Sequence, residues 1–183
     1  MTNDYKNGAK MKKMVSKAAA KRAIVNQGRM YGRVILGVYV TNYDKPRITT
    51  VKRVGGVVVV KQEHKPLTGK CVNQYFQELL ADNPNAYVNT NVHIKGIVDS
   101  LRYENKHSKD FERLFGVSIE GVDLVSMWQG LGRWLQDERA GLPDDGELQC
   151  EIINKSYYID DKYSVQLDNN INKKATALAL TFA

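Results

Sequence analysis

The middle of the chain alternates short apolar, β-branched segments with turn residues. Val, Ile and Thr dominate residues 33–41, 47–53 and 57–61, a composition typical of β-strands. The first two segments are separated by Asn-Tyr-Asp-Lys-Pro at residues 42–46, and the last two by Gly55-Gly56. Because Asn, Asp, Pro and Gly favour tight turns, this pattern predicts a three-stranded antiparallel meander.

Apolar residues at helical spacing predict helices on both sides of the meander. Residues 8–27 are rich in Ala, Lys and Met and lack proline, which favours a basic amphipathic helix. Residues 71–81 and 121–139 each carry an apolar stripe, and a short helix is expected near residues 111–115. The side chains expected in the core from the longest of these helices are Trp128, Leu131 and Leu135.

Branched or alternating residues predict further strands at 87–98, 148–158, 163–167 and 175–182. The elements together predict an α+β fold: a single domain with an antiparallel β-meander, two to three packed helices, C-terminal strands and a basic N-terminal helix. We divide the chain into a basic N-terminal helical arm, residues 1–32, and an α+β domain, residues 33–183.

Charge is distributed unevenly along the 183 residues. The chain has 27 Lys and Arg against 20 Asp and Glu, a net charge of +7. Residues 1–70 hold 16 of these bases and only 3 of the acids, so their net charge is +13, whereas residues 71–183 carry −6. This asymmetry favours a nucleic-acid backbone as the partner of the basic part. The alternative is a solvated basic face that neutralises the acidic half of the fold or of a neighbouring subunit.

Tyrosines lie among the basic residues of the N-terminal part. Single-stranded nucleic acid is bound by cations that follow the backbone and by flat rings on which bases stack. Tyr31 and Tyr43 suit stacking, whereas Tyr39, inside the first predicted strand, suits the core. The candidate nucleic-acid-binding residues are Lys10, Lys13, Lys17, Lys21, Arg29, Tyr31, Arg33, Tyr43, Arg47, Lys52 and Arg53.

Motifs for cofactor chemistry are missing from the sequence. His64, His93 and His107 are far apart, and the chain has neither a phosphate-binding glycine loop nor a dinucleotide fingerprint. We therefore expect no metal site, no cofactor and no catalytic residue among them.

The predicted order of three strands, a helix, a strand and further helices resembles the ribonuclease H-like arrangement. That resemblance implies a sheet whose carboxylates hold two divalent ions for phosphodiester hydrolysis. The candidate carboxylates are Asp44, Glu78 and Asp99, with Asp123 or Asp137 as a fourth. The family places an acid within its first strand, where this chain has Val38, Tyr39 and Val40. We therefore expect Asp44, Glu78 and Asp99 not to form a two-metal centre.

These patterns favour a small basic nucleic-acid-binding protein, of phage or mobile-element type, over an enzyme. Two alternatives stay open: a structural or assembly protein of a virion or similar oligomer, and a ribonuclease H-like metal-dependent nuclease. The expected partners are DNA or RNA and further copies of the chain in a homo-oligomer or larger assembly. No apolar run reaches the length of a membrane span, so we expect a cytoplasmic protein, in the host cytoplasm or the virion if viral.

Overall fold

A five-stranded mixed sheet organises the fold. A computed structural model describes residues 5–6, 9–41, 46–61, 72–104, 109–160, 165–168 and 172–183. The sheet has the order β6-β5-β4-β7-β8. Its strands are β4 (Val34–Thr41), β5 (Arg47–Val54), β6 (Val57–Lys61), β7 (Ala86–Thr90) and β8 (Leu114–Gly116). β4, β5 and β6 pair antiparallel, which confirms the predicted meander, and β7 and β8 add parallel to β4.

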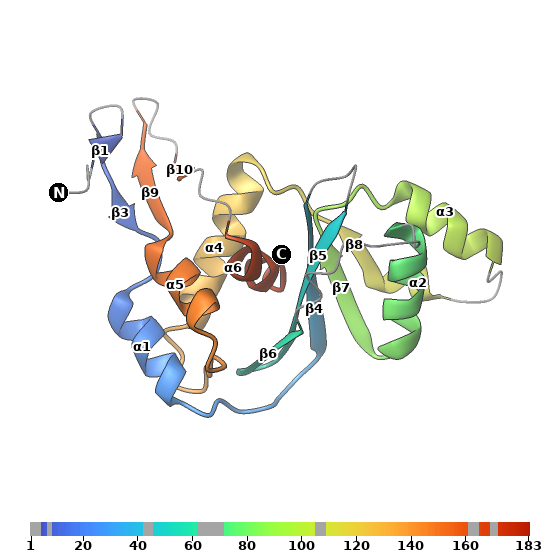
Figure 1. The fold of residues 1–183 in the computed structure, drawn as a ribbon, viewed down its shortest axis with the longest axis horizontal. Coiled ribbons are helices and arrows are strands. Elements are labelled where there is room, and N and C mark those ends of the chain that lie inside the picture. The colour runs from blue at the N-terminus through green and yellow to red at the C-terminus, as the bar shows by residue number, and fades with distance from the viewer. Residues whose placement is uncertain are drawn as a thin grey trace.

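Helices cover both faces of this sheet (Figure 1). On one face, Leu36 and Val38 of β4 pack with Phe76 of α2 (Val72–Asp82) and Ile97 of α3 (Lys95–Glu104). The other face carries α4 (Gly121–Trp134) and α6 (Lys173–Leu180). Because side chains alternate along a strand, the odd-numbered residues of β4, including Tyr39, belong to this second face.

Helix α6 approaches β4 so closely that only glycine fits between them. A Cβ on Gly37 would lie 1.7 Å from the carbonyl oxygen of Ala177. The Nδ2 of Asn89, on β7, donates to the carbonyl of Leu180 at 2.8 Å, and Arg53, on β5, donates to the carbonyl of Thr181 at 2.7 Å. Contacts from three strands therefore fix α6 against the sheet.

The C-terminal part departs from the sequence prediction. The strand predicted at 175–182 is helix α6, and most of the segment predicted as a strand at 148–158 is helix α5 (Gly146–Asn154). Asp145 caps α5, because its carboxylate accepts from the backbone N–H of Leu148 at 3.0 Å. Strands β9 (Ser156–Ile159) and β10 (Val165–Leu167) follow, and β10 lies inside the strand predicted at 163–167.

The N-terminal helix is shorter than predicted. Instead of residues 8–27, α1 covers Lys17–Val25 and begins at the cap Ser16, whose hydroxyl accepts from the N–H of Ala19. Its buried face is made of small alanines, among them Ala20 and Ala23. The residues before it form β1 (Tyr5–Lys6), β2 (Ala9–Lys10) and β3 (Lys12–Lys13), and β3 pairs antiparallel with β9.

Two further segments differ in part from the prediction. The strand predicted at 87–98 ends at Thr90, and α3 begins within its second half. The short helix predicted at 111–115 is the 3-10 helix η1 (Asp110–Arg113), which leads directly into β8.

The core assignment of α4 is confirmed: Trp128, Leu131 and Leu135 are each 0% exposed. No helix in the described part of the chain is long and apolar enough to cross a membrane.

Candidate functional site at the carboxyl ends of β4 and β7

The carboxyl ends of β4 and β7 meet at one edge of the sheet, because the two strands are parallel with Val38 paired to Thr90. Crevices outside the carboxyl ends of parallel strands commonly bind ligands. Two adjoining cavities of about 390 Å³ and 440 Å³ lie here, and Tyr39, Ile119 and Glu120 line both of them. We call this region the crevice.

Three uncharged polar side chains reach the crevice from different elements. Tyr39 lies on β4 and Thr176 lies on α6, whereas Asn91 directly follows β7. Tyr39 is half-buried: it packs against the apolar cluster beneath, as predicted for a core residue, while it lines both cavities. The amide of Asn91 accepts from the N–H of Val40 at 2.8 Å and donates to the carbonyl of Val40 at 2.9 Å. Asn91 thereby holds the ends of the two strands together.

A buried ion pair forms another wall of the crevice. The Nζ of Lys155 lies 2.8 Å from Oδ1 of Asp168, with the two side chains only 5% and 11% exposed. Oδ2 of Asp168 accepts from the N–H of Ser156 at 2.9 Å. The Lys155 ammonium also lies 5.5 Å from the centre of the Trp128 ring. Both oxygens of this carboxylate thus have partners within the protein. Among the described residues that line the crevice, Glu120 is the exposed carboxylate.

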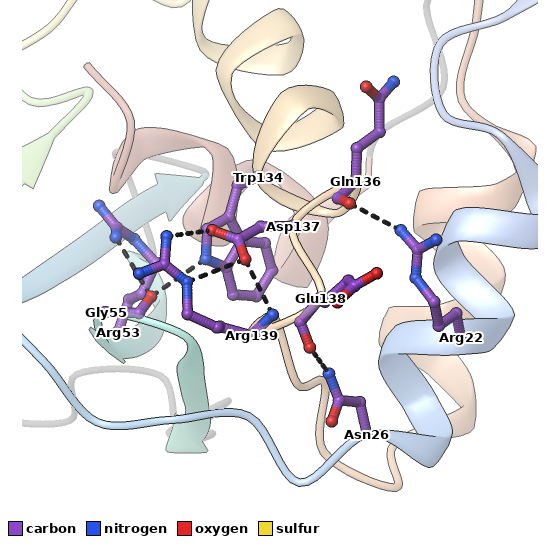
Figure 2. Close-up of polar contacts among 9 residues, drawn as sticks. All are labelled: Arg22, Asn26, Arg53, Gly55, Trp134, Gln136, Asp137, Glu138 and Arg139. Carbon is purple, nitrogen blue, oxygen red and sulfur yellow. Dashed lines mark hydrogen bonds and ion pairs between the residues drawn. The ribbon is translucent and has the colours of Figure 1, made fainter.

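Of the carboxylates considered for a metal centre, the four that the structure describes do not gather at the crevice. Glu78 and Asp99 lie on α2 and α3, which cover the opposite face of the sheet (Figure 1). Asp123 is exposed in the first turn of α4. Asp137 accepts from Arg139, which lowers the pKa of Asp137 to about 2, and Figure 2 shows the pair in the loop after α4. Asp44 lies outside the described residues.

Divalent ions in two-metal sites need several converging carboxylates. Among the described residues, no group of three or more His, Cys, Asp or Glu side chains could hold a metal ion. The first strand of the meander, β4, contains no acid. Its side chain in the crevice is Tyr39, and a phenol is a poor ligand for magnesium. The described side chains that line the crevice therefore do not fit a pair of divalent ions.

The candidate nucleic-acid-binding lysines do not share one helix. Lys10 belongs to β2, and Lys13 belongs to β3 with its Nζ donating to the carbonyl of Asn154 at 3.1 Å. Lys17 and Lys21 are exposed on α1, one turn apart. The prediction of one helix over residues 8–27, which would have carried all four lysines, is wrong in its first half, because the helix begins only at Lys17.

The remaining candidates are spread over the linker after α1 and over the meander. Arg29, Arg33 and Arg47 are exposed and Lys52 is half-buried, whereas Tyr43 lies outside the described residues. That these residues bind nucleic acid therefore stays a prediction.

Arg53 and Tyr31 take part in packing. Arg53 donates to the carbonyl and the hydroxyl of Thr181 at the end of α6, and burial lowers the pKa of its guanidinium. Figure 2 shows Arg53 beside Gly55, whose carbonyl accepts from the indole N–H of Trp134 at 3.0 Å. The Tyr31 ring is 40% exposed and lies 4.8 Å from the guanidinium of Arg139. We therefore assign Arg53 to the stability of α6.

No pattern in the sequence predicts Asn91, Glu120 or Thr176 as site residues. The run Asn89-Thr90-Asn91 at the end of an apolar strand is the signal that could have indicated the crevice, because polar residues at strand ends commonly line ligand sites. Thr176 was hidden inside a segment interpreted as a strand, so its position on a helix facing β4 could not be inferred.

No protein-family model matches the chain, and no curated protein matches its sequence. The chain is similar to the large terminase nuclease of thermophilic phage G20c with bound magnesium, with a TM-score of 0.61 at 12% identity, over 93% of this chain and 96% of that one. The nuclease domain of the large terminase subunit of bacterial virus Sf6 gives a TM-score of 0.56 at 10% identity, over 93% and 97% of the two chains.

A third solved structure supports the same fold. The large terminase nuclease domain of Thermus phage P74-26 gives a TM-score of 0.56 at 12% identity, over 93% of this chain and 94% of that one. The chain has the fold of phage large terminase nuclease domains.

Proposed function

We propose that this chain binds DNA on the α6 side of its sheet, without hydrolysing it through a pair of metal ions. The fold supports the first part of this proposal, because it is shared with domains that are nucleases. The net charge of +7 also supports it, since cations attract a phosphate backbone.

The proposal that the chain does not hydrolyse DNA through two metal ions rests on the chemistry of the crevice. Tyr39 and Thr176 supply hydroxyl groups, which form hydrogen bonds to phosphates, sugars and bases, whereas the amide of Asn91 is bonded to the backbone of Val40. They do not supply the carboxylates that hold two divalent ions. The crevice is therefore equipped to contact a nucleic acid and is not equipped to cleave it by that mechanism.

A second candidate function is metal-dependent nuclease activity, and the fold is the observation that favours it. In that case Glu120 would be the accessible carboxylate of the crevice, and Asp168 would have to leave Lys155. Breaking a buried ion pair is costly, which makes this candidate the weaker of the two.

The test is a titration of fluorescently labelled single-stranded and duplex DNA at several salt concentrations, with magnesium and with a chelator. We expect salt-dependent binding that does not require magnesium and persists in the chelator. Failure of the parent to bind either form would refute the proposal.

The same samples, analysed for DNA length, test the second candidate. Metal-dependent shortening that is lost in Glu120→Gln and kept in Asp99→Asn would establish the nuclease. Asp99 is the matched control because it is exposed on α3, which covers the other face of the sheet.

A further inference from the structure

Two aromatic rings, on β7 and β8, and the arginine directly before β4 form a stack on the sheet. The rings of Tyr87, on β7, and Phe115, on β8, are stacked with their centres 6.0 Å apart and an angle of 23° between their planes. The guanidinium of Arg33 lies 5.1 Å from the centre of the Tyr87 ring, and its Nη1 donates to the Tyr87 hydroxyl at 3.2 Å. These contacts hold the three side chains in one fixed arrangement.

This cluster is open to solvent because α6 lies over β4 and β5. Phe115 is 43% exposed and Arg33 is also exposed. A cavity of about 300 Å³ lies beside them, lined in part by Tyr87, Phe115 and Val117. Val117 also lines the second cavity of the crevice. The aromatic cluster and the crevice therefore adjoin on the same face of the sheet.

The charge of the cluster is positive. No carboxylate in the described part of the chain forms an ion pair with Arg33. An arginine whose charge is not paired can contact a phosphate, and an exposed ring beside it offers a flat face to a base. A duplex keeps its bases stacked inside, so such a ring reaches a base only in a single strand or where the base has left the helix.

We propose that Arg33, Tyr87 and Phe115 form a stacking site for an unpaired base of single-stranded DNA, with the adjoining phosphate at Arg33. This inference rests on the proposed DNA binding and adds to it the form of DNA that is bound. One exposed ring and a small cavity suit a base better than a second protein, because stable protein interfaces bury about 800 Å² on each partner.

The experiment compares binding of an oligothymidine with that of an abasic strand of the same length, by fluorescence anisotropy. We expect the parent to bind the oligothymidine about 5- to 150-fold more tightly, the range associated with stacking of one base. Phe115→Ala abolishes this preference, whereas Phe115→Trp keeps it because the indole also offers a flat ring. The slope of affinity against salt stays unchanged in both variants, since stacking is not ionic.

Tyr103→Ala is the matched control, because Tyr103 is 83% exposed on α3, which covers the other face of the sheet. This variant should bind like the parent. A preference for bases that survives in Phe115→Ala would overturn the stacking site. A Phe115→Ala variant whose mass by light scattering falls while its DNA affinity is unchanged would also overturn it, and would assign the cluster to contacts between copies of the chain.

The result for the parent alone separates this inference from the proposed function. Salt-dependent binding with equal affinity for the thymidine and abasic strands would refute the stacking site and leave DNA binding intact. No binding to either strand, or to duplex DNA, would refute both.

Discussion

Replacing Gly37 by alanine tests the contact that positions α6. A Cβ at this residue would lie 1.7 Å from the carbonyl oxygen of Ala177, whereas real Cβ atoms essentially never approach within 3.0 Å of such an atom. Helix α6 would therefore have to retreat by about 1.3 Å or more. The obstacle is backbone, and residues Lys174–Leu180 of α6 are buried, so no flexible side chain can make room.

Overpacking of a core costs about 1–3 kcal/mol and sometimes more, and we expect about 3 kcal/mol or more at this contact. For a chain of this length, 1 kcal/mol shifts the Tm by about 2–4 °C. The expected fall in Tm is therefore about 6–12 °C or more, measured by thermal denaturation followed by circular dichroism.

Gly132→Ala is the control. The new Cβ would lie 3.5 Å from the carbonyl oxygen of Met14, an ordinary contact, and Gly132 lies inside α4. That change should raise stability by about 0.5–1 kcal/mol. A Gly37→Ala variant that melts within about 2 °C of the parent would show that α6 does not lie against β4 as described.

Three further changes test the core, the α5–α6 contact and the basic helix. Trp128→Ala should lower the free energy of unfolding by about 3–5 kcal/mol, because the ring is fully buried; denaturant titration measures this, and a loss below 1 kcal/mol would contradict it. Asp145→Ala should cost about 1–3 kcal/mol at neutral pH, since it removes the cap of α5 and an ion pair with buried Lys174 at 2.7 Å. Burial tends to raise the pKa of the Asp145 carboxyl. The N–H groups at the start of α5 and the Lys174 ammonium outweigh burial, so the net effect is a pKa below its ordinary value. The stabilisation by Asp145 is therefore fully present above the pKa that its carboxyl has in the unfolded chain, and it disappears as the pH falls through the pKa in the folded protein. A difference in the free energy of unfolding between parent and variant that persists below this folded-state pKa would contradict the prediction. Changing Lys17 and Lys21 to Gln should flatten the log–log salt slope of DNA binding by about 1.4 on single strands and 1.8 on duplexes if each lysine meets one phosphate, and an unchanged slope would remove α1 from the binding surface.

The meander could be predicted because its strands are β-branched and its turns contain Gly, Asn, Asp and Pro. Helix α6 could not be predicted from periodicity. It is buried on nearly all sides, so its sequence shows no amphipathic stripe, and the alternation of Ala and Leu resembles a strand. The high helix propensity of both residues was the better indicator.

The crevice depends on tertiary contacts that a single sequence does not display. Tyr39, Asn91 and Thr176 are far apart in the chain. They line adjoining cavities because β7 pairs parallel to β4 and α6 packs against the same strands. The absence of an acid from the first strand could be read directly from the sequence, and it led to the expectation that Asp44, Glu78 and Asp99 form no two-metal centre. The structure adds that Glu78 and Asp99 lie on the helices of the opposite face.

The most direct test of the account is the length of DNA after it has been bound by the parent protein in manganese. Labelled single-stranded DNA is incubated at a protein concentration that gives saturation, and then separated on a denaturing gel. The account predicts full binding and DNA of unchanged length, equal to the sample with chelator. Shorter products that appear only with the metal ion would contradict it, and would show that the crevice holds catalytic ions although the first strand of the meander contains no acid.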